Sequence, residues 1–258
     1  TIHSFPTRRS SDLTGEHAVA PGEHDEYYGF WSGGHSGEVR VVGVPSMREI
    51  MRIPVFQREG ARGFGHDEQT KQVLREGGNL SEGTGHEWGD THHPILSETD
   101  GTYDGRYLWI NEKASGRMAR INLKYFETDA ITDIPNMQAC HGCSVQSPDT
   151  SYVFGIGEFR VPIPNDGTNV DNPDDYWSVF AALDPETMDV EWEVRVTGNL
   201  DNADSGKNGT WAFATGYNKE EAFEIEGMSR DDRDYLKVFH VHRIEEAREA
   251  GDADVVNG

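Results

Sequence analysis

The amino-acid sequence predicts an all-β protein. Short runs of alternating apolar and polar residues recur along the chain, and Asp, Gly, Asn and Pro separate them. This pattern is typical of antiparallel strands joined by tight turns. The runs are Glu38–Val44, Arg106–Asn111, Arg117–Leu123, Tyr152–Ile156, Trp177–Leu183, Val190–Val196, Thr210–Thr215 and Tyr235–Val241. Helical periodicity is limited to Ile244–Ala250 and a short turn at Ser46–Met51, so we expect sheets with little helix.

A weak internal repeat indicates how these strands are arranged. A turn precedes an apolar strand at Tyr103–Gly105, at Ser147–Asp149 and near Asp204–Gly206, and the first two turns lie about 45 residues apart. The third turn comes later because a segment rich in Pro, Asn and Asp, Pro162–Asp175, intervenes. A four-stranded unit that recurs every ~40–50 residues has the period of a propeller blade. We therefore expect a partial β-propeller of about four blades, with a β-sandwich as the alternative.

The charge of the chain excludes two classes of partner. The 258 residues include 46 acidic and 23 basic residues, so the formal net charge is −23. Nucleic acids and anionic membrane surfaces both require a positive counter-surface. No run of 18 apolar residues is present, so no membrane span is predicted. The basic residues are mostly Arg, with only 6 Lys, and this combination predicts a halophilic protein that stays soluble in concentrated salt.

The first residues of the chain have an unusual composition. Residues 3–13 read HSFPTRRSSDL, which is the translation of a common sequencing adapter. We therefore expect residues 1–13 to be adapter-derived and non-native, and we exclude them from the fold. The alternative is a native basic N-terminal tail.

The adjacent histidines His92 and His93 form the most informative motif. In a regular strand they would point to opposite faces, so an irregular backbone is needed to aim both at one metal. Pro94 is expected to end the ladder pairing and to keep His93 extended. Asp90 lies two residues before His92 and is placed to orient an imidazole through its second nitrogen. The alternative is an ordinary polar surface loop.

A second motif, Gln138–Cys143, has three interpretations. A c-type haem site requires His directly after the second cysteine, and Ser144 occupies that position. A redox-active dithiol requires a following helix, and the sequence predicts none. The third interpretation makes His141 a metal ligand, with Gly142 allowing close approach of another backbone and the two cysteines in a structural role.

Several long motifs, in order along the chain, resemble the nitrous oxide reductases. The first is Gly29–Phe56, which reads GFWSGGHSGEVRVVGVPSMREIMRIPVF, and the second is Asp90–Pro94. The third is Asp104–Ile121, which reads DGRYLWINEKASGRMARI, and the similarity continues through His141–Gly142. It covers essentially all of residues 27–250.

The resemblance implies a seven-bladed propeller, of which this chain is expected to be a part. In the family, seven histidines at the inner ends of the blades hold a four-copper sulfide cluster, and His92, His93 and His141 match the first three. The other four are expected beyond Gly258. Imidazole suits copper, and the sulfide is inorganic, so the cysteines are not required as ligands. Residues 14–258 are thus expected to be a partial N-terminal propeller domain, with the C-terminal cupredoxin domain and its two-copper centre outside this sequence.

The resemblance also implies a calcium site. The matching residues are Tyr217, Glu220, Met228 (through its main-chain oxygen) and Asp234. Calcium prefers oxygen ligands of this kind. Taken without the resemblance, the segment from Glu220 to Asp234 is a solvated acidic loop.

Two acidic residues and the remaining histidines complete the candidate site. Asp201 matches an acidic residue near the cluster and is expected to interact with a ligand, and Asp90 is our candidate for proton handling. The histidines without a matching ligand position include His24, His35, His66, His86, His240 and His242. Of these, His86 is expected at most to line the site.

The function that the resemblance implies is the reduction of nitrous oxide to dinitrogen and water, with two electrons and two protons. The expected partners are an electron donor such as a small cytochrome or cupredoxin, and a second copy in a homodimer. The expected location is the periplasm or another site outside the cytoplasmic membrane, with the leader peptide outside this sequence. The segment alone is expected to be inactive. The alternatives are a non-catalytic propeller that binds a partner, and a mononuclear copper or zinc protein, for which three imidazoles suffice.

Overall fold

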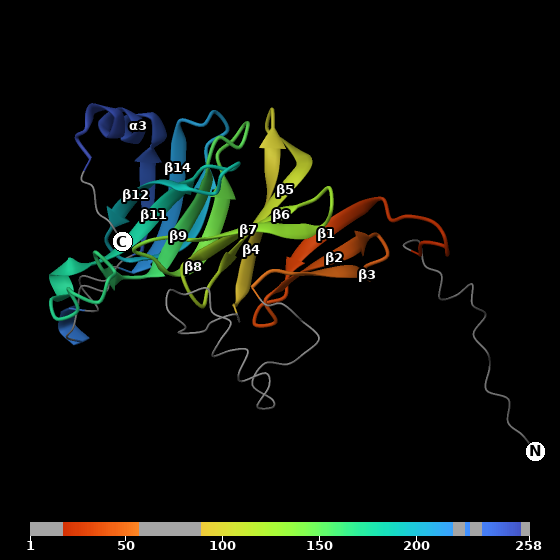
Figure 1. The fold of residues 1–258 in the computed structure, drawn as a ribbon, viewed down its shortest axis with the longest axis horizontal. Coiled ribbons are helices and arrows are strands. Elements are labelled where there is room, and N and C mark those ends of the chain that lie inside the picture. The colour runs from red at the N-terminus through yellow and green to blue at the C-terminus, as the bar shows by residue number, and fades with distance from the viewer. Residues whose placement is uncertain (1–17, 57–88, 219–224, 228–233, 254–258) are drawn as a thin grey trace, which may run out of the picture.

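A computed structural model of the chain describes residues 18–56, 89–218, 225–227 and 234–253, and these form four antiparallel sheets (Figure 1). The first sheet contains β1 (Tyr27–Ser32), β2 (Glu38–Val44) and β3 (Glu49–Pro54). The second contains β4 (Thr91–Thr99), β5 (Thr102–Glu112), β6 (Arg117–Asn122) and β7 (Glu127–Asp133). The third contains β8 (Gln138–Val145), β9 (Val153–Phe159), β10 (Val161–Pro162), β11 (Tyr176–Leu183) and β12 (Val190–Val196). The fourth contains β13 (Asn199–Ser205), β14 (Trp211–Asn218) and β15 (Tyr235–His240).

Within each sheet the main strands pair in the order in which they occur in the chain. The second sheet is the simple meander β4-β5-β6-β7, and the third is the meander β8-β9-β11-β12 with the short β10 paired to the start of β11. The segment between β10 and β11 contains a 3-10 helix, Pro173–Asp175, within the insertion expected from the sequence. Four successive meanders agree with the partial propeller of about four blades.

Three apolar clusters hold the successive sheets together, and each lies between two neighbouring sheets. The first and second sheets share a cluster that contains Val39, Ile53, Leu108 and Ile121. The second and third share one that contains Trp109, Met118, Val153 and Leu183. The third and fourth share one that contains Phe154, Phe180, Leu200 and Phe239. Face-to-face packing of consecutive sheets is the arrangement of propeller blades.

Because the inner sheets are covered on both faces, their strands are apolar on both faces. In β5, Leu108 and Ile110 face the first sheet, whereas Trp109 between them faces the third sheet, and all three side chains are fully buried. This explains the near-continuous apolar run in β5, since a strand with one solvated face would alternate. Burial of such side chains stabilises a fold by about 1.5–3 kcal/mol each.

Most predicted elements are present, and two expectations were wrong. The strands β2 and β12 have the predicted bounds, and the C-terminal helix is α3 (Val241–Ala250). The helical turn expected at Ser46–Met51 does not form. This segment leads into β3 instead, because β3 pairs with β2 and buries Ile53. The turn expected at Tyr103–Gly105 lies inside β5, and the chain reverses earlier, at Asp100 and Gly101.

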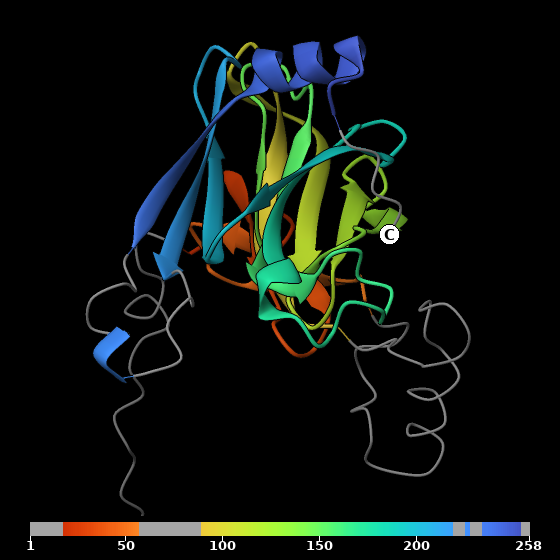
Figure 2. The same ribbon diagram turned by 90° about the vertical axis from the view of Figure 1, so that its left-hand side faces the viewer.

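The helix α3 lies across one end of the sheets (Figure 2). The Nδ1 atom of His240 caps its first turn by accepting a hydrogen bond from the Arg243 amide, and Gly251, with φ 75°, ends it in the left-handed conformation. Val241 is buried, and the Arg248 guanidinium pairs with Glu191 on β12 at 2.5 Å. Within the described ranges, no helix has the length and apolar character needed to cross a membrane.

The first strands of the second, third and fourth sheets are neighbours in space. The strand β8 contacts β4 on one side and β13 on the other. In a propeller these first strands line the central axis, so residues on β4, β8 and β13 meet there although they lie far apart in the sequence. The three predicted copper ligands lie on β4 and β8.

Candidate metal centre

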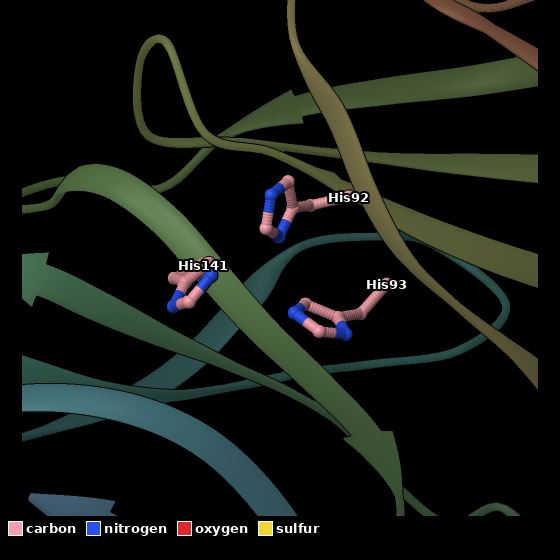
Figure 3. A group of neighbouring side chains, drawn as sticks. All are labelled: His92, His93 and His141. Carbon is pink, nitrogen blue, oxygen red and sulfur yellow. The ribbon is translucent and has the colours of Figure 1, made fainter. Parts of the chain in front are cut away.

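The side chains of His92, His93 and His141 converge on one point (Figure 3). His92 and His93 extend from β4, and His141 extends toward them from β8. One ligand nitrogen from each ring lies within 4.8 Å of those of the other two rings. The ring centroids are separated by 4.7 Å (His92–His93), 4.6 Å (His92–His141) and 5.1 Å (His93–His141). The structure thus brings together the three histidines that the sequence singled out.

A β-bulge in β4 allows two adjacent histidines to point the same way. Thr91 pairs with Glu112 and Pro94 pairs with Ile110, so three steps along β4 match two along β5. The extra residue falls at His92–His93 and breaks the alternation of faces. The irregular backbone was therefore predicted correctly. The expectation that Pro94 ends the pairing was wrong, because Pro94 remains in register and β4 continues to Thr99.

A second bulge, in β8, presents His141. Cys140 pairs with Gly157 and Gly142 pairs with Ile156, so His141 is the extra residue. Gly142 is required for the close approach of β13, because a Cβ atom there would lie 2.8 Å from Asn202 Cα and 3.0 Å from the Asp201 carbonyl oxygen. The proposed role of Gly142 in close backbone approach is thereby confirmed.

The surroundings of the three rings favour neutral imidazoles. Burial, followed by the neighbouring rings His141 and His93, lowers the pKa of His92. Burial and the His141 ring lower the pKa of His93, and burial also lowers the pKa of His141. Lys113 adds to the effect on each of the three. The neutral form is the one that donates a lone pair to a metal.

Nδ1 of His92 is buried without a hydrogen-bond partner, and Nδ1 of His141 is buried with only an Asp201 carboxylate oxygen 3.0 Å away. Buried polar atoms are nearly always satisfied, so the orphaned nitrogen of His92 fits a site that a metal fills. This donor set, all imidazole nitrogen, suits copper or zinc.

The comparisons with known proteins agree with the geometry. A family model described as nitrous oxide reductase propeller repeat 2 matches residues 134–202, a segment that contains His141 and Asp201. The nitrous-oxide reductase of Stutzerimonas stutzeri is 49% identical over 236 residues, which is 91% of this chain and 36% of that protein. The enzyme of Pseudomonas fluorescens is also 49% identical, over 93% of this chain and 37% of the relative.

Over nine-tenths of its length the chain is similar to one segment of the nitrous oxide reductases. A third relative, the nitrous-oxide reductase of Ralstonia nicotianae, is 42% identical over 92% of this chain and 38% of its own length. The chain therefore spans a little over a third of the relatives it matches. Among solved structures, hydrazine synthase from Kuenenia stuttgartiensis shares the fold with a TM-score of 0.54 over 83% of this chain and 47% of that one. At 11% identity this likeness concerns the fold alone.

The two predicted acidic residues lie near the three histidines. Oδ1 of Asp201, at the start of the fourth sheet, lies 3.0 Å from Nδ1 of His141 without the angle of a hydrogen bond. The Asp90 carboxylate lies 3.5 Å from Nδ1 of the exposed His35, so it contacts a histidine other than the predicted one. Its charge still acts on His92 and His141, since it opposes the lowering of the pKa of both rings.

The two cysteines face the core between the second and third sheets. Cys140 and Cys143 are free thiols buried in the apolar cluster there, and the strand β8 continues past them without a helix. Burial raises the pKa of Cys143 to about 12 and also raises that of Cys140. These surroundings fit the structural role favoured from the sequence and not a reactive dithiol.

The predicted calcium ligands and several histidines are only partly described. Glu220 and Met228 lie outside the described residues, as do His66 and His86. Tyr217 lies at the end of β14 and Asp234 directly precedes β15, next to the paired residues Gly216 and Tyr235. The two ends of the proposed calcium segment are therefore adjacent, and the site itself remains a prediction.

Two features near the histidines were not predicted from the sequence. Nζ of Lys113 lies 2.9 Å from the nearly buried Glu158 carboxylate, which places an ion pair beside the three rings. Asn111 is fully buried and bonds to backbone groups of both histidine-bearing strands. The sequence feature that could have indicated Asn111 is its position as a polar residue directly after the apolar run of β5.

Proposed function

We propose that this chain is part of the propeller of a nitrous oxide reductase, and that His92, His93 and His141 are three ligands of its copper-sulfide cluster. The observation that carries the proposal is the convergence of three imidazoles from two bulged inner strands, with the buried Nδ1 of His92 lacking a partner. The expected reaction is N2O + 2 e⁻ + 2 H⁺ → N2 + H2O. The four-copper sulfide cluster would supply the binding and reduction of nitrous oxide.

The residues of this chain would hold and tune that centre. The imidazoles supply neutral nitrogen ligands, which copper prefers. Asp201 is placed to orient His141, and Asp90 supplies a negative charge near the rings for proton handling. The apolar cores on both sides of β5 support the neighbouring strand β4, and the core between the second and third sheets also contains residues of β8.

Further properties are inferred from the family resemblance alone. These are a closed ring of seven blades, a calcium ion held by Tyr217, Glu220, Met228 and Asp234, a homodimer, a small cytochrome or cupredoxin as electron donor, a two-copper centre in a C-terminal domain, and a location in the periplasm or elsewhere outside the cytoplasmic membrane. The adjacency of Tyr217 and Asp234 at one end of a hairpin supports the calcium site. Removal of calcium with a chelator should lower the unfolding temperature of the chain, and Asp234→Asn should remove that response.

Activity is tested in a protein that has the whole propeller. In a chimera, residues 18–253 replace the matching segment of the Stutzerimonas stutzeri reductase. We expect about six copper ions per chain, four in the cluster and two in the electron-entry centre, and nitrous oxide consumption with a reduced dye as donor. His92→Ala and His141→Ala should abolish consumption, whereas His242→Ala, an exposed histidine on α3, should not.

The two alternatives predict different results in the same chimera. A mononuclear copper or zinc protein would bind a single metal ion through the same three histidines, in addition to the two copper ions of the electron-entry centre. A non-catalytic propeller would bind no metal that depends on them. The convergence of the histidines argues against the latter, because a binding module has no reason to gather three imidazoles and leave the buried Nδ1 of His92 unpaired.

A further inference from the structure

Asn111 occupies a special position between the two strands that bear the histidines. It lies near the end of β5, directly after the apolar residues Leu108–Ile110, and its side chain is fully buried. The β5 strand pairs with β4 within the second sheet and contacts β8 of the third sheet. A buried amide at this junction requires partners for one acceptor and two donors.

The Asn111 side chain finds these partners on the backbones of the ligand strands. Its Oδ1 accepts a hydrogen bond from the backbone N–H of His93 at 2.8 Å. Its Nδ2 donates to two consecutive backbone carbonyls of β8, those of Cys140 and His141. One rigid planar group thus bonds to the backbone of two of the three histidines at once.

These bonds compensate for the two bulges. A bulge leaves backbone groups without their ladder partners, and such groups are costly to bury unpaired. The bulge in β4 falls at His92–His93 and the bulge in β8 falls at His141, and Asn111 bonds to both segments. A second hydrogen bond also holds the backbone at His93, because the Cys143 thiol donates to the His93 carbonyl.

We propose that Asn111 is a positioning residue that sets the spacing and orientation of His93 and His141, and so prepares the three-histidine site for metal. This inference rests on the proposed function of that site. No close substitute supplies the same bonds: Asp keeps the acceptor for the His93 amide but cannot donate to the two carbonyls, and Leu supplies neither. Gln is one methylene longer than Asn, so its amide would be misplaced for the three backbone groups.

The test is a titration of the chain with cupric ion, with affinity measured by competition and nitrogen ligation by electron paramagnetic resonance. The variants are Asn111→Leu and Asn111→Asp, each also made with His141→Ala. The matched control is Gln146→Leu, because Gln146 also donates a buried amide hydrogen bond to a backbone carbonyl, that of Gly209. Urea unfolding of each variant reports the loss of stability separately.

We expect Asn111→Leu to weaken copper binding at least tenfold and to change the nitrogen splitting, as loss of a group that orients ligands does. Gln146→Leu should change the affinity less than threefold at a similar loss of stability. With His141→Ala already present, Asn111→Leu should weaken binding much less, because one of the two positioned ligands is gone.

Two results would overturn the inference in distinguishable ways. If the unsubstituted chain binds copper no better than a chain with His92→Ala and His141→Ala, the proposed site fails, and the role of Asn111 fails with it. If the unsubstituted chain binds copper through these histidines but Asn111→Leu matches Gln146→Leu in affinity and spectrum, the site stands and Asn111 is only structural.

Discussion

Glu112 and Arg117 form a fully enclosed ion pair at the end of β5, with 2.6 Å between the Glu112 carboxylate and Nε of Arg117. The Arg117 guanidinium also lies over the ring of Phe56, 4.9 Å from its centroid, and Ser115 donates a hydrogen bond to the same carboxylate. Glu112 pairs in register with Thr91, the residue before His92. This network therefore anchors the end of β5 beside the start of β4, the strand that bears His92.

We expect Arg117→Met to destabilise the chain by about 3–5 kcal/mol, because it leaves the Glu112 charge buried without a partner. The double variant with Glu112→Gln should recover most of that loss, since a neutral amide is cheaper to bury. Urea unfolding of the single and double variants measures both values. A single variant that loses less than about 1 kcal/mol would contradict this account.

Asp104 links acid stability to a local network in the second sheet. Burial raises the pKa of this carboxyl, but hydrogen bonds from Ser97, Arg106 and Thr99 outweigh burial and hold the pKa well below its usual value. A depressed pKa contributes stability that is fully present above the unfolded value, near 3.9, and is lost as the pH falls toward the folded value.

We therefore expect Asp104→Asn to cost roughly 2 kcal/mol at pH 7 and progressively less below about pH 4. The free energy of unfolding in urea, measured between pH 7 and pH 3, checks this. The control is Asp171→Asn, at an exposed position in the insertion. A cost that stays constant across this range would show that Asp104 acts through packing and not through its charge.

The two thiols should be inert in the folded chain. Both are buried, and the pKa of Cys143 is raised to about 12, so little thiolate is present at pH 8. We expect iodoacetamide to modify neither cysteine at pH 8 under native conditions and both in denaturant, as counted by mass spectrometry. Rapid modification of the native chain would contradict the structural role.

The net charge of −23 predicts a response to salt. Screening weakens self-repulsion, so the free energy of unfolding should rise as potassium chloride increases from dilute buffer to molar concentration. Sucrose serves as the uncharged control, because it favours compact states without screening charge. A chain that is equally stable in dilute buffer and in molar salt would argue against a halophilic protein.

The sequence alone predicted the fold class and singled out the three histidines that converge in the structure. The alternating runs predicted β2 and β12 with their observed bounds, because period-two patterning directly reflects which face of a strand is buried. The adjacent histidines and the His141 motif stood out as unusual residues within β-rich sequence. The resemblance then joined them into one site, and the comparisons support the family.

The tertiary structure decided how those residues meet. Pairing with β2 converted the expected turn at Ser46–Met51 into the start of β3, since cross-strand bonds and burial of Ile53 outweigh local periodicity. The two bulges, the contact of Asp90 with His35 and the bonds of Asn111 depend on strands that lie far apart in the chain. No local pattern encodes such contacts, because register and sheet packing are fixed only when separate segments assemble.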